Sequence, residues 1–473
     1  MSTGKNRILL IGVDGIGLSD LKKYQLKNFQ TAIQNGSSGK ISGCAALPEV
    51  TAWTGLATGC TPDQHGILGP ATIDKDSGRV RAVGPCDWNR KPVWELVDQQ
   101  DLLTHHFNIP ARHPEAEQDH SLSISPLFFN QIQRGRLSPL RSVQPSNFFD
   151  AAKSLAIAPA QVDRATLELF IPDIANLDPA NHPAIGKIAG CIASNLSIQA
   201  ISGQTMAELD WNLFMIRFSL VDEINRILKT TSDSPDRFKH VREAACRTLN
   251  LCLGSFRRLA GDHTLVLCSM KGEGGGFIAF EGSGIRSGEK LLGPRPEDIA
   301  PTLLNLMGLS AADPMNGRVL EEMFSSAPQT ESCPALPAIG KTTPPTHTES
   351  GWLLEPSELN AAPWRVEKLA HQQRAAAHLA RGHWLEALPH LLEQHVTTPF
   401  SLEQALPLCQ ALFHSGLVKE STQLMNRTAE LHPAAPISPL LHALAAHHSG
   451  DPEAASKLVE ARKRDQTVRP DWK

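Results

Sequence analysis

The stretch RILLIGVDGIG, residues 7–17, decides how this chain folds. It contains an apolar run, residues 8–13, that ends at Asp14 and is followed by Gly15 and Gly17. A short apolar run bounded by glycines is typical of a strand that is buried on both faces of a parallel sheet. Glycine lets the chain turn sharply after such a strand. The stretch therefore predicts a buried strand that holds a carboxylate at its carboxyl end.

Similar apolar runs recur at residues 213–218, 264–269 and 276–280. The stretches between them read as helix, for example residues 51–58. Apolar strands that alternate with helices predict an α/β domain with a mostly parallel sheet and flanking helices. Ligands of such sheets bind at the carboxyl ends of the strands. The chemistry of the protein is therefore expected near Asp14.

The composition is that of an ordinary globular protein. Among the 473 residues are 45 basic and 49 acidic side chains, so the net charge of −4 draws the chain neither to nucleic acid nor to an anionic membrane. The run at residues 8–13 is far shorter than the roughly 20 residues of a membrane span. The nine cysteines are scattered without a C-x-x-C pair, which favours reduced thiols. We expect a cytoplasmic protein with no nucleic-acid or membrane partner.

A proline-rich stretch divides the chain into two parts. Residues 325–363 carry seven prolines and almost no periodic apolar pattern, which is typical of a linker. The parts on either side of it are residues 1–324 and residues 364–473. The first contains the predicted α/β domain, and the second reads as helix throughout.

The second part contains an internal repeat. Gly382, Gly416 and Gly450 are spaced 34 residues apart, and small residues stand five positions after and seven positions before each of them. This pattern resembles tetratricopeptide repeats, which are helix-turn-helix units whose small residues allow close helix packing. The resemblance implies that residues 364–473 bind a protein or peptide. The alternative is an unrelated helical bundle with a coincidental spacing.

Three segments of the first part form a series. The first is the strand that ends at Asp14, the second is W-T-x-x-A-T-G-x-x-P-x-x-H-G-I over residues 53–67, and the third comprises residues 282–289 and 298–309. In this order they resemble the alkaline phosphatase superfamily, in particular its type I phosphodiesterase and nucleotide pyrophosphatase branch. The resemblance implies an alkaline-phosphatase-like sheet, with an insertion at about residues 85–210 that caps the site.

The resemblance also implies a two-zinc site, in which three Asp and three His hold the metals while a Ser or Thr attacks phosphorus. The family's first zinc-binding Asp corresponds to Asp14, and the Asp of its D-x-x-x-H motif corresponds to Asp222. The His of that motif is replaced by Arg226. In the S-D-H-G motif, Met270 and Lys271 replace the Asp and the His. By this match two of the six metal ligands remain.

The nucleophile position of the family falls on Glu49, nine residues before Thr58. A carboxylate cannot serve as the usual alkoxide nucleophile. A shift of two residues would place Thr51 there, but it would disturb an otherwise gap-free match from Trp53 to Gly59. Thr51 is therefore the alternative nucleophile.

The replacements bring positive charge to positions where the family binds metal. Met and protonated Lys are poor zinc ligands, whereas Lys271 and Arg226 are cations. We hypothesise that these two cations form a salt-bridge cluster with Asp14, Glu49 and Asp222, since buried carboxylates without metal need such partners.

These observations predict a catalytically degenerate protein that acts as a scaffold or anion sensor, with a protein-binding helical tail. No cofactor is expected, and a phosphate-like anion is a candidate ligand. The alternative is an active phosphodiesterase or phosphatase with an unusual site, in which Thr51 or Thr54 attacks, Lys271 or Arg226 stabilises the phosphate charge, and zinc is bound if the site needs a metal. A third interpretation assigns the whole function to the tail and makes the large domain inert.

Overall fold

The computed structural model describes residues 7–44, 47–73, 80–112, 121–135, 137, 141–177, 182–231, 238–312, 314–326, 374–375, 378–379, 382–397, 402–433, 438–454 and 456. Contacts within the chain divide it into two compact units. The first comprises Met1–Ala45, Glu49–Pro70 and Ala82–Trp352, and the second comprises Ala46–Pro48, Ala71–Arg81 and Leu353–Lys473. Apart from its first two residues, the predicted linker lies outside the described residues, so the predicted domain boundaries stay predictions.

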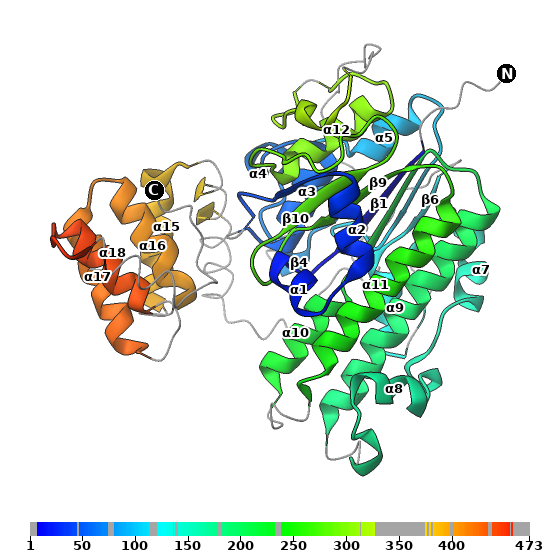
Figure 1. The fold of residues 1–473 in the computed structure, drawn as a ribbon, viewed down its shortest axis with the longest axis horizontal. Coiled ribbons are helices and arrows are strands. Elements are labelled where there is room, and N and C mark those ends of the chain that lie inside the picture. Colours follow the sequence, from blue (N-terminus) through cyan, green and yellow to red (C-terminus); the bar gives the residue numbers. More distant parts are fainter. Residues whose placement is uncertain are drawn as a thin grey trace. The chain divides into compact units, whose positions relative to one another are not determined.

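The first unit is built on a mixed sheet of eight strands (Figure 1). Their order is β2 (Ser37–Lys40), β10 (Phe277–Glu281), β9 (Thr264–Ser269), β1 (Ile8–Val13), β8 (Leu213–Phe218), β5 (Thr104–Phe107), β6 (Leu122–Ile124) and β7 (Val143–Gln144). The central strand β1 runs parallel to both β8 and β9, whereas β10 and β7 join antiparallel. A further two-stranded sheet pairs β3 (Ala71–Ile73) with β4 (Val80–Ala82). The predicted α/β sheet is confirmed.

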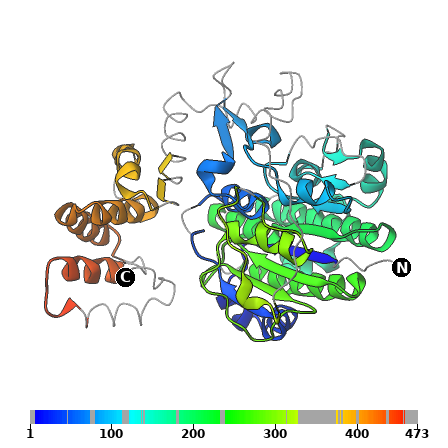
Figure 2. The same ribbon diagram turned by 90° about the horizontal axis from the view of Figure 1, so that it is seen from above.

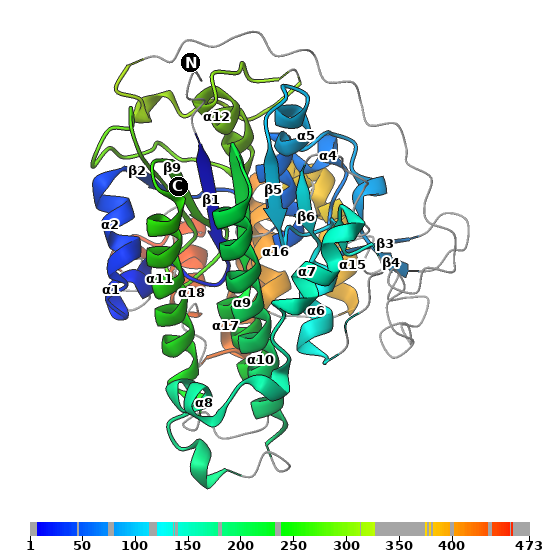
Figure 3. The ribbon, with the colours of Figure 1, turned by 90° about the vertical axis from the view of Figure 1, so that its right-hand side faces the viewer.

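Helices cover both faces of the sheet (Figures 1 and 3). The side chains of β1 are therefore buried on both sides. Leu9, Ile11 and Val13 belong to one apolar cluster, and Ile8 and Leu10 belong to the other. The helices that supply the first cluster are α1 (Leu18–Lys23), α2 (Lys27–Asn35), α6 (Pro126–Gln133), α7 (Phe149–Ser154), α8 (Arg164–Phe170), α9 (Pro183–Glu208), α10 (Leu220–Thr230) and α11 (Val241–Ala260). The helices that supply the second are α3 (Glu49–Thr58), α5 (Val93–Asp98) and α12 (Ile299–Leu306), and the short helix α4 (Pro62–His65) follows α3.

Helix α9 is the one helix in the described part of the chain that is long and apolar enough to cross a membrane. Of its most apolar stretch, 72% is buried inside the structure. The helix packs against α6, α10 and α11. Such burial is characteristic of the core helix of a globular unit.

The expected cap over residues 85–210 needs correction. This stretch supplies β5, β6 and β7 to the main sheet and α9 to its core. The hydrophobic pattern does not predict strand β5, because two of its residues are the polar His105 and His106. Both are buried in the structure. Leu122 N donates a hydrogen bond to Nδ1 of His105 at 3.0 Å, and Nε2 lies 3.0 Å from Asp210 O. Burial lowers the pKa of His105 to about 4, so this histidine is a neutral part of the sheet.

The described residues of the C-terminal region are helical, which confirms the expected all-α character. Helices α15 (Trp384–Thr397), α16 (Leu402–His414), α17 (Val418–Leu431) and α18 (Ser438–His448) pack successively against one another (Figures 1 and 2). The repeated glycines Gly382, Gly416 and Gly450 all have left-handed φ values, 70°, 82° and 77°. They lie just before α15, between α16 and α17, and just after α18, where helix-turn-helix units need a turn. The assignment to tetratricopeptide repeats stays a prediction.

Candidate functional site

Asp14 lies at the carboxyl end of β1 and is almost completely buried, with 2% of the residue exposed. Its backbone N–H donates to Phe218 O at 2.9 Å, which ties it to the end of β8. Both carboxylate oxygens accept a hydrogen bond from Trp53 Nε1 at 3.1 Å. Arg217 Nε donates to Oδ2 at 2.5 Å. The buried carboxylate is thus held by an indole and a guanidinium.

Arg217 is the cation of the site, and the sequence analysis missed it. It pairs with Gly12 across the β1–β8 ladder, so its side chain lies on the same face of the sheet as Asp14. Its guanidinium forms ion pairs with both Asp14 and Glu49, and 9% of its side chain is exposed. It also lies 5.9 Å from the ring of Trp53. An arginine within an otherwise apolar strand, LFMIRF, is the signal that could have identified it.

Gly12 makes room for Trp53. A Cβ atom on Gly12 would lie 2.1 Å from Trp53 Cη2, which no side chain can tolerate. The fully buried indole therefore occupies the space that a β1 side chain would fill. This close approach brings the start of α3 over Asp14.

Helix α3 directs Glu49 toward Asp14 and turns the threonines elsewhere. Glu49 and Trp53 are four residues apart and share one face of the helix. Thr51 is about 200° around the helix from Glu49 at ~100° per residue. It is 1% exposed, and its hydroxyl makes no hydrogen bond to a residue that the structure describes. The hydroxyl of Thr54 donates to Val50 O within the helix at 2.8 Å.

Asp222 lies beside the same loop, but its carboxylate engages a different cation. A Cβ on Gly15 would lie 2.6 Å from Asp222 N, so the two backbones are in close contact. The Asp222 carboxylate pairs with Arg226 Nε at 3.1 Å, at the surface, where the side chains are 32% and 65% exposed. The predicted pairing of Arg226 with Asp222 is present, as an exposed pair within α10.

The loop after β9 packs, backbone against backbone, onto the loop after β1. Gly15 N donates to Lys271 O at 3.1 Å, and Gly15 and Gly272 form a parallel bridge. A Cβ on Gly272 would lie 2.2 Å from Gly17 N. Met270 is completely buried in the apolar cluster on the α3 face of the sheet. The two loops therefore close together at the positions where the resemblance implies an Asp and a His.

The hypothesis about Lys271 did not include the cation that this geometry shows. Arg217 forms ion pairs with both Asp14 and Glu49 in the part of the chain that the structure describes. The reason is register: β8 places Arg217 directly beside the end of β1, whereas Lys271 follows β9 in the loop that packs on Gly15.

His65, within the motif after α3, lies in a turn. It is fully buried, and Ile67 N donates to its Nδ1 at 3.1 Å. Burial lowers its pKa to about 3, so it stays neutral. It therefore brings no charge to the site.

The residues at the site do not fit a two-zinc centre. Among the described residues, no three His, Cys, Asp or Glu side chains come together in a way that could hold a metal. Of the two surviving ligand positions, Asp14 is bound by Arg217 and Asp222 by Arg226. A permanently charged guanidinium between Asp14 and Glu49 repels a dication from the place where these carboxylates would bind it.

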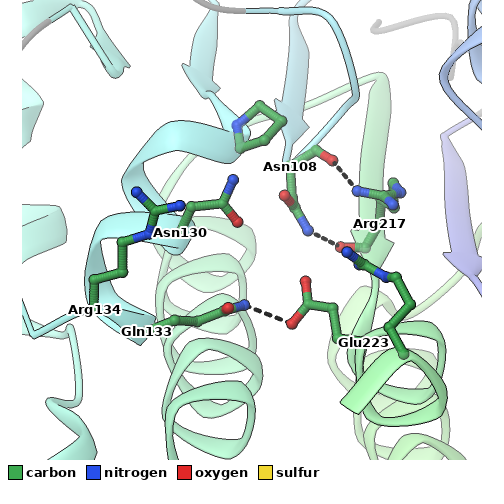
Figure 4. Close-up of a pocket in the computed structure, with 8 residues that line it drawn as sticks. Asn108, Asn130, Gln133, Arg134, Arg217 and Glu223 are labelled. Atoms are coloured by element: carbon green, nitrogen blue, oxygen red, sulfur yellow. Dashed lines mark hydrogen bonds between the residues drawn. The ribbon is translucent and has the colours of Figure 1, made fainter. Parts of the chain in front are cut away.

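A polar pocket of about 280 Å³ lies next to Arg217, at the ends of β5 and β8. Helices α6 and α10 form its walls (Figure 4). Its lining includes Asn108 and Arg217 from the strand ends, Asn130, Gln133 and Arg134 from α6 and its C-terminus, and Glu223 and Arg226 from α10. Arg217 thus has one side toward the buried carboxylates and another toward this pocket.

Comparisons with known proteins give a matching family profile and several similar solved structures. The family profile for type I phosphodiesterase / nucleotide pyrophosphatase matches residues 8–267. The chain is similar to the solved structure of murine ectonucleotide pyrophosphatase / phosphodiesterase 5, with 10% identity, coverage of 66% of this chain and 97% of that one, and a TM-score of 0.40. It is also similar to a putative sulfatase from Bacteroides thetaiotaomicron, with 11% identity, 67% and 74% coverage and a TM-score of 0.45. A third similar structure is a phosphonate monoester hydrolase from Silicibacter pomeroyi, with 11% identity, coverage of 67% of this chain and 76% of that one, and a TM-score of 0.39. No curated protein matches the chain.

Proposed function

Since the chain belongs to the type I phosphodiesterase / nucleotide pyrophosphatase family, we propose that it is a catalytically degenerate member of that family. Its first unit acts as a scaffold or anion sensor, and residues 364–473 bind a protein or peptide. The protein needs no metal cofactor for this role. Its working place is the cytoplasm, with neither nucleic acid nor a membrane as partner.

The observation that carries this proposal is the ion pair of Arg217 with both Asp14 and Glu49. An ionised carboxylate as deeply buried as Asp14 is stable only with a charged or hydrogen-bonding partner. Metal ions supply that partner in a two-zinc site, and here Arg217 and Trp53 supply it. The proposal therefore explains how a site without its metal ligands keeps a buried acid.

The nucleophile position supports the same conclusion. Glu49 is the first residue of α3, and its carboxylate is engaged by Arg217. Thr51 is buried on another side of the helix, and the hydroxyl of Thr54 is bonded to the helix backbone. No threonine hydroxyl of α3 is hydrogen-bonded to Asp14 or Arg217 among the contacts described for this helix.

The tail adds a separate binding function to this proposal. Its helices pack in succession, and buried small residues lie at the predicted positions, for example Ala387, Cys409 and Ser421. Ser421 Oγ donates to Cys409 O at 2.8 Å, a contact that needs two helices in close approach. Repeats of this kind present extended surfaces to partner proteins.

Turnover of a generic aryl phosphodiester, bis-p-nitrophenyl phosphate, tests the catalytic part. We expect no release of p-nitrophenol above the buffer rate, with or without added zinc, because none of the threonine hydroxyls described in α3 is hydrogen-bonded to Asp14 or Arg217. The Thr51→Ala variant should give the same result. The matched control is Thr248→Ala, which removes a helical hydroxyl that donates to Ala244 O in α11.

The active-enzyme alternative predicts the opposite pattern. Zinc-dependent turnover that Thr51→Ala abolishes and Thr248→Ala preserves would make Thr51 the nucleophile and overturn the degenerate assignment.

A further inference from the structure

We propose that the pocket between α6 and α10 binds the phosphate group of a small phosphorylated sugar or polyol and leaves the ligand intact. The inference rests on the proposed function, because it names the anion that a non-catalytic first unit would sense.

Helix α6 presents unmatched donors to the pocket. Asn130 and Arg134 are four residues apart, so they share one face of the helix end, and both point toward the pocket in Figure 4. Within the described residues, no hydrogen bond or ion pair engages either side chain. A guanidinium offers five N–H donors in a fork that matches the oxygens of a phosphate group. A donor pair of this kind, aimed into a pocket, suits an oxyanion.

Arg226 supplies a second cation from the opposite wall. Its contact with Asp222 runs through Nε, and 65% of its side chain is exposed. Arg217 lies at the base of the pocket, but Asp14 and Glu49 already balance its charge. We therefore assign the anion chiefly to Arg134, with Arg226, which shares its charge with Asp222, as a second cation and the amide of Asn130 as a neutral donor.

Among the lining residues that the structure describes, the one carboxylate is that of Glu223, and neutral groups satisfy it. Glu223 Oε1 accepts a hydrogen bond from Ser219 Oγ at 2.7 Å, and Oε2 accepts one from Gln133 Nε2 at 2.5 Å (Figure 4). These bonds hold the carboxylate against the two helices and reduce its competition for the arginines. A tetrahedral anion can then approach Arg134 and Arg226 without displacing Glu223.

The size of the pocket and its lining residues indicate which substituent the bound phosphate group has. A volume of about 280 Å³ is the space of roughly nine water molecules at ~30 Å³ each, more than inorganic phosphate fills. No aromatic side chain is among the lining residues that the structure describes, so a nucleobase would find nothing to stack on. Amide groups such as those of Asn108 and Asn130 suit hydroxyl groups instead. The substituent is therefore small and polyhydroxylated.

Isothermal titration calorimetry on the full chain tests this assignment with ribose 5-phosphate, ribose, inorganic phosphate and AMP. We expect ribose 5-phosphate to bind more tightly than inorganic phosphate, AMP to bind no more tightly than ribose 5-phosphate, and ribose to give no heat. Arg134→Gln and Arg226→Gln should each weaken ribose 5-phosphate at least tenfold, about 1.4 kcal/mol. The control is Arg164→Gln on α8, which removes an exposed ion pair with Glu168 and should leave binding unchanged.

The possible outcomes are distinct. Absence of binding at millimolar ligand, or equal affinity in Arg134→Gln, Arg226→Gln and the parent chain, would overturn the pocket assignment. Tighter binding of AMP than of ribose 5-phosphate, or equal binding of inorganic phosphate, would overturn the sugar or polyol part. A phosphorus NMR spectrum of the incubated mixture separates binding from chemistry. Release of free phosphate would refute the degenerate function, even if the arginine variants still place the ligand in this pocket.

Discussion

Replacing Arg217 with methionine is expected to destabilise the first unit by about 3–5 kcal/mol, the usual effect of removing one partner from a buried ion pair. Most of the lost stability comes from Asp14. This residue is 2% exposed, and its buried carboxylate would keep Trp53 as its remaining partner. Glu49 contributes less, since 27% of its side chain is exposed and water can solvate it. Urea unfolding of the full chain, followed by circular dichroism, measures the loss as a lower midpoint for the first unit.

A second variant separates the buried charge from the loss of packing. In Arg217→Met combined with Asp14→Asn the buried carboxylate of Asp14 is gone, and the asparagine oxygen can still accept from Trp53 Nε1. We expect this double variant to recover at least half of the stability lost in Arg217→Met. The control Arg164→Met removes an exposed pair and should change stability by less than about 1 kcal/mol. An equal loss in Arg217→Met and Arg164→Met would show that Arg217 does not support Asp14.

Gly272→Ala is expected to destabilise the first unit by about 3 kcal/mol, the upper end of the usual range for overpacking. The added Cβ would lie 2.2 Å from Gly17 N and 2.3 Å from Ile16 C. Both atoms belong to the backbone and cannot rotate away, so one loop must shift from the other. Thermal unfolding followed by circular dichroism should show a clearly lower midpoint.

The matched control for this change is Gly186→Ala, near the start of α9. A Cβ there meets no atom within 4 Å, and alanine favours the helix, so we expect a small gain of about 0.5–1 kcal/mol. If Gly272→Ala unfolds at the same temperature as the parent, the two loops do not close together over the site as described.

The sequence predicts the centre of the fold because local patterns determine it. The run at residues 8–13 is apolar at every position except Gly12, and β1 is buried on both faces as that pattern requires. The pattern fails at β5, where His105 and His106 occupy interior positions. Their rings are paired or stacked inside the structure, for example His106 on Trp94 at 4.6 Å. No local hydrophobic pattern can reveal such an arrangement.

The candidate site is predictable only where residues follow a motif. Asp14, Glu49 and Asp222 are placed by the sequence match, and the structure brings the first two together around one cation. The identity of that cation depends on strand pairing between residues about 200 positions apart, as the bond from Arg217 to Asp14 shows. Lys271 is the candidate that the motif offers, whereas the ion pairs with Asp14 and Glu49 are made by Arg217, which lies outside the motif. Matching motifs did not identify Arg217, because it is a buried charge within an apolar strand and not part of a motif.

We propose that the guanidinium of Arg217 takes the place of metal between Asp14 and Glu49. The most direct test is the zinc content of the full chain, purified without chelators and dialysed against micromolar zinc, measured by inductively coupled plasma mass spectrometry. We predict zinc far below one equivalent per chain, since the guanidinium repels a dication and the surviving ligands are already paired. One or two equivalents of tightly held zinc would contradict the account.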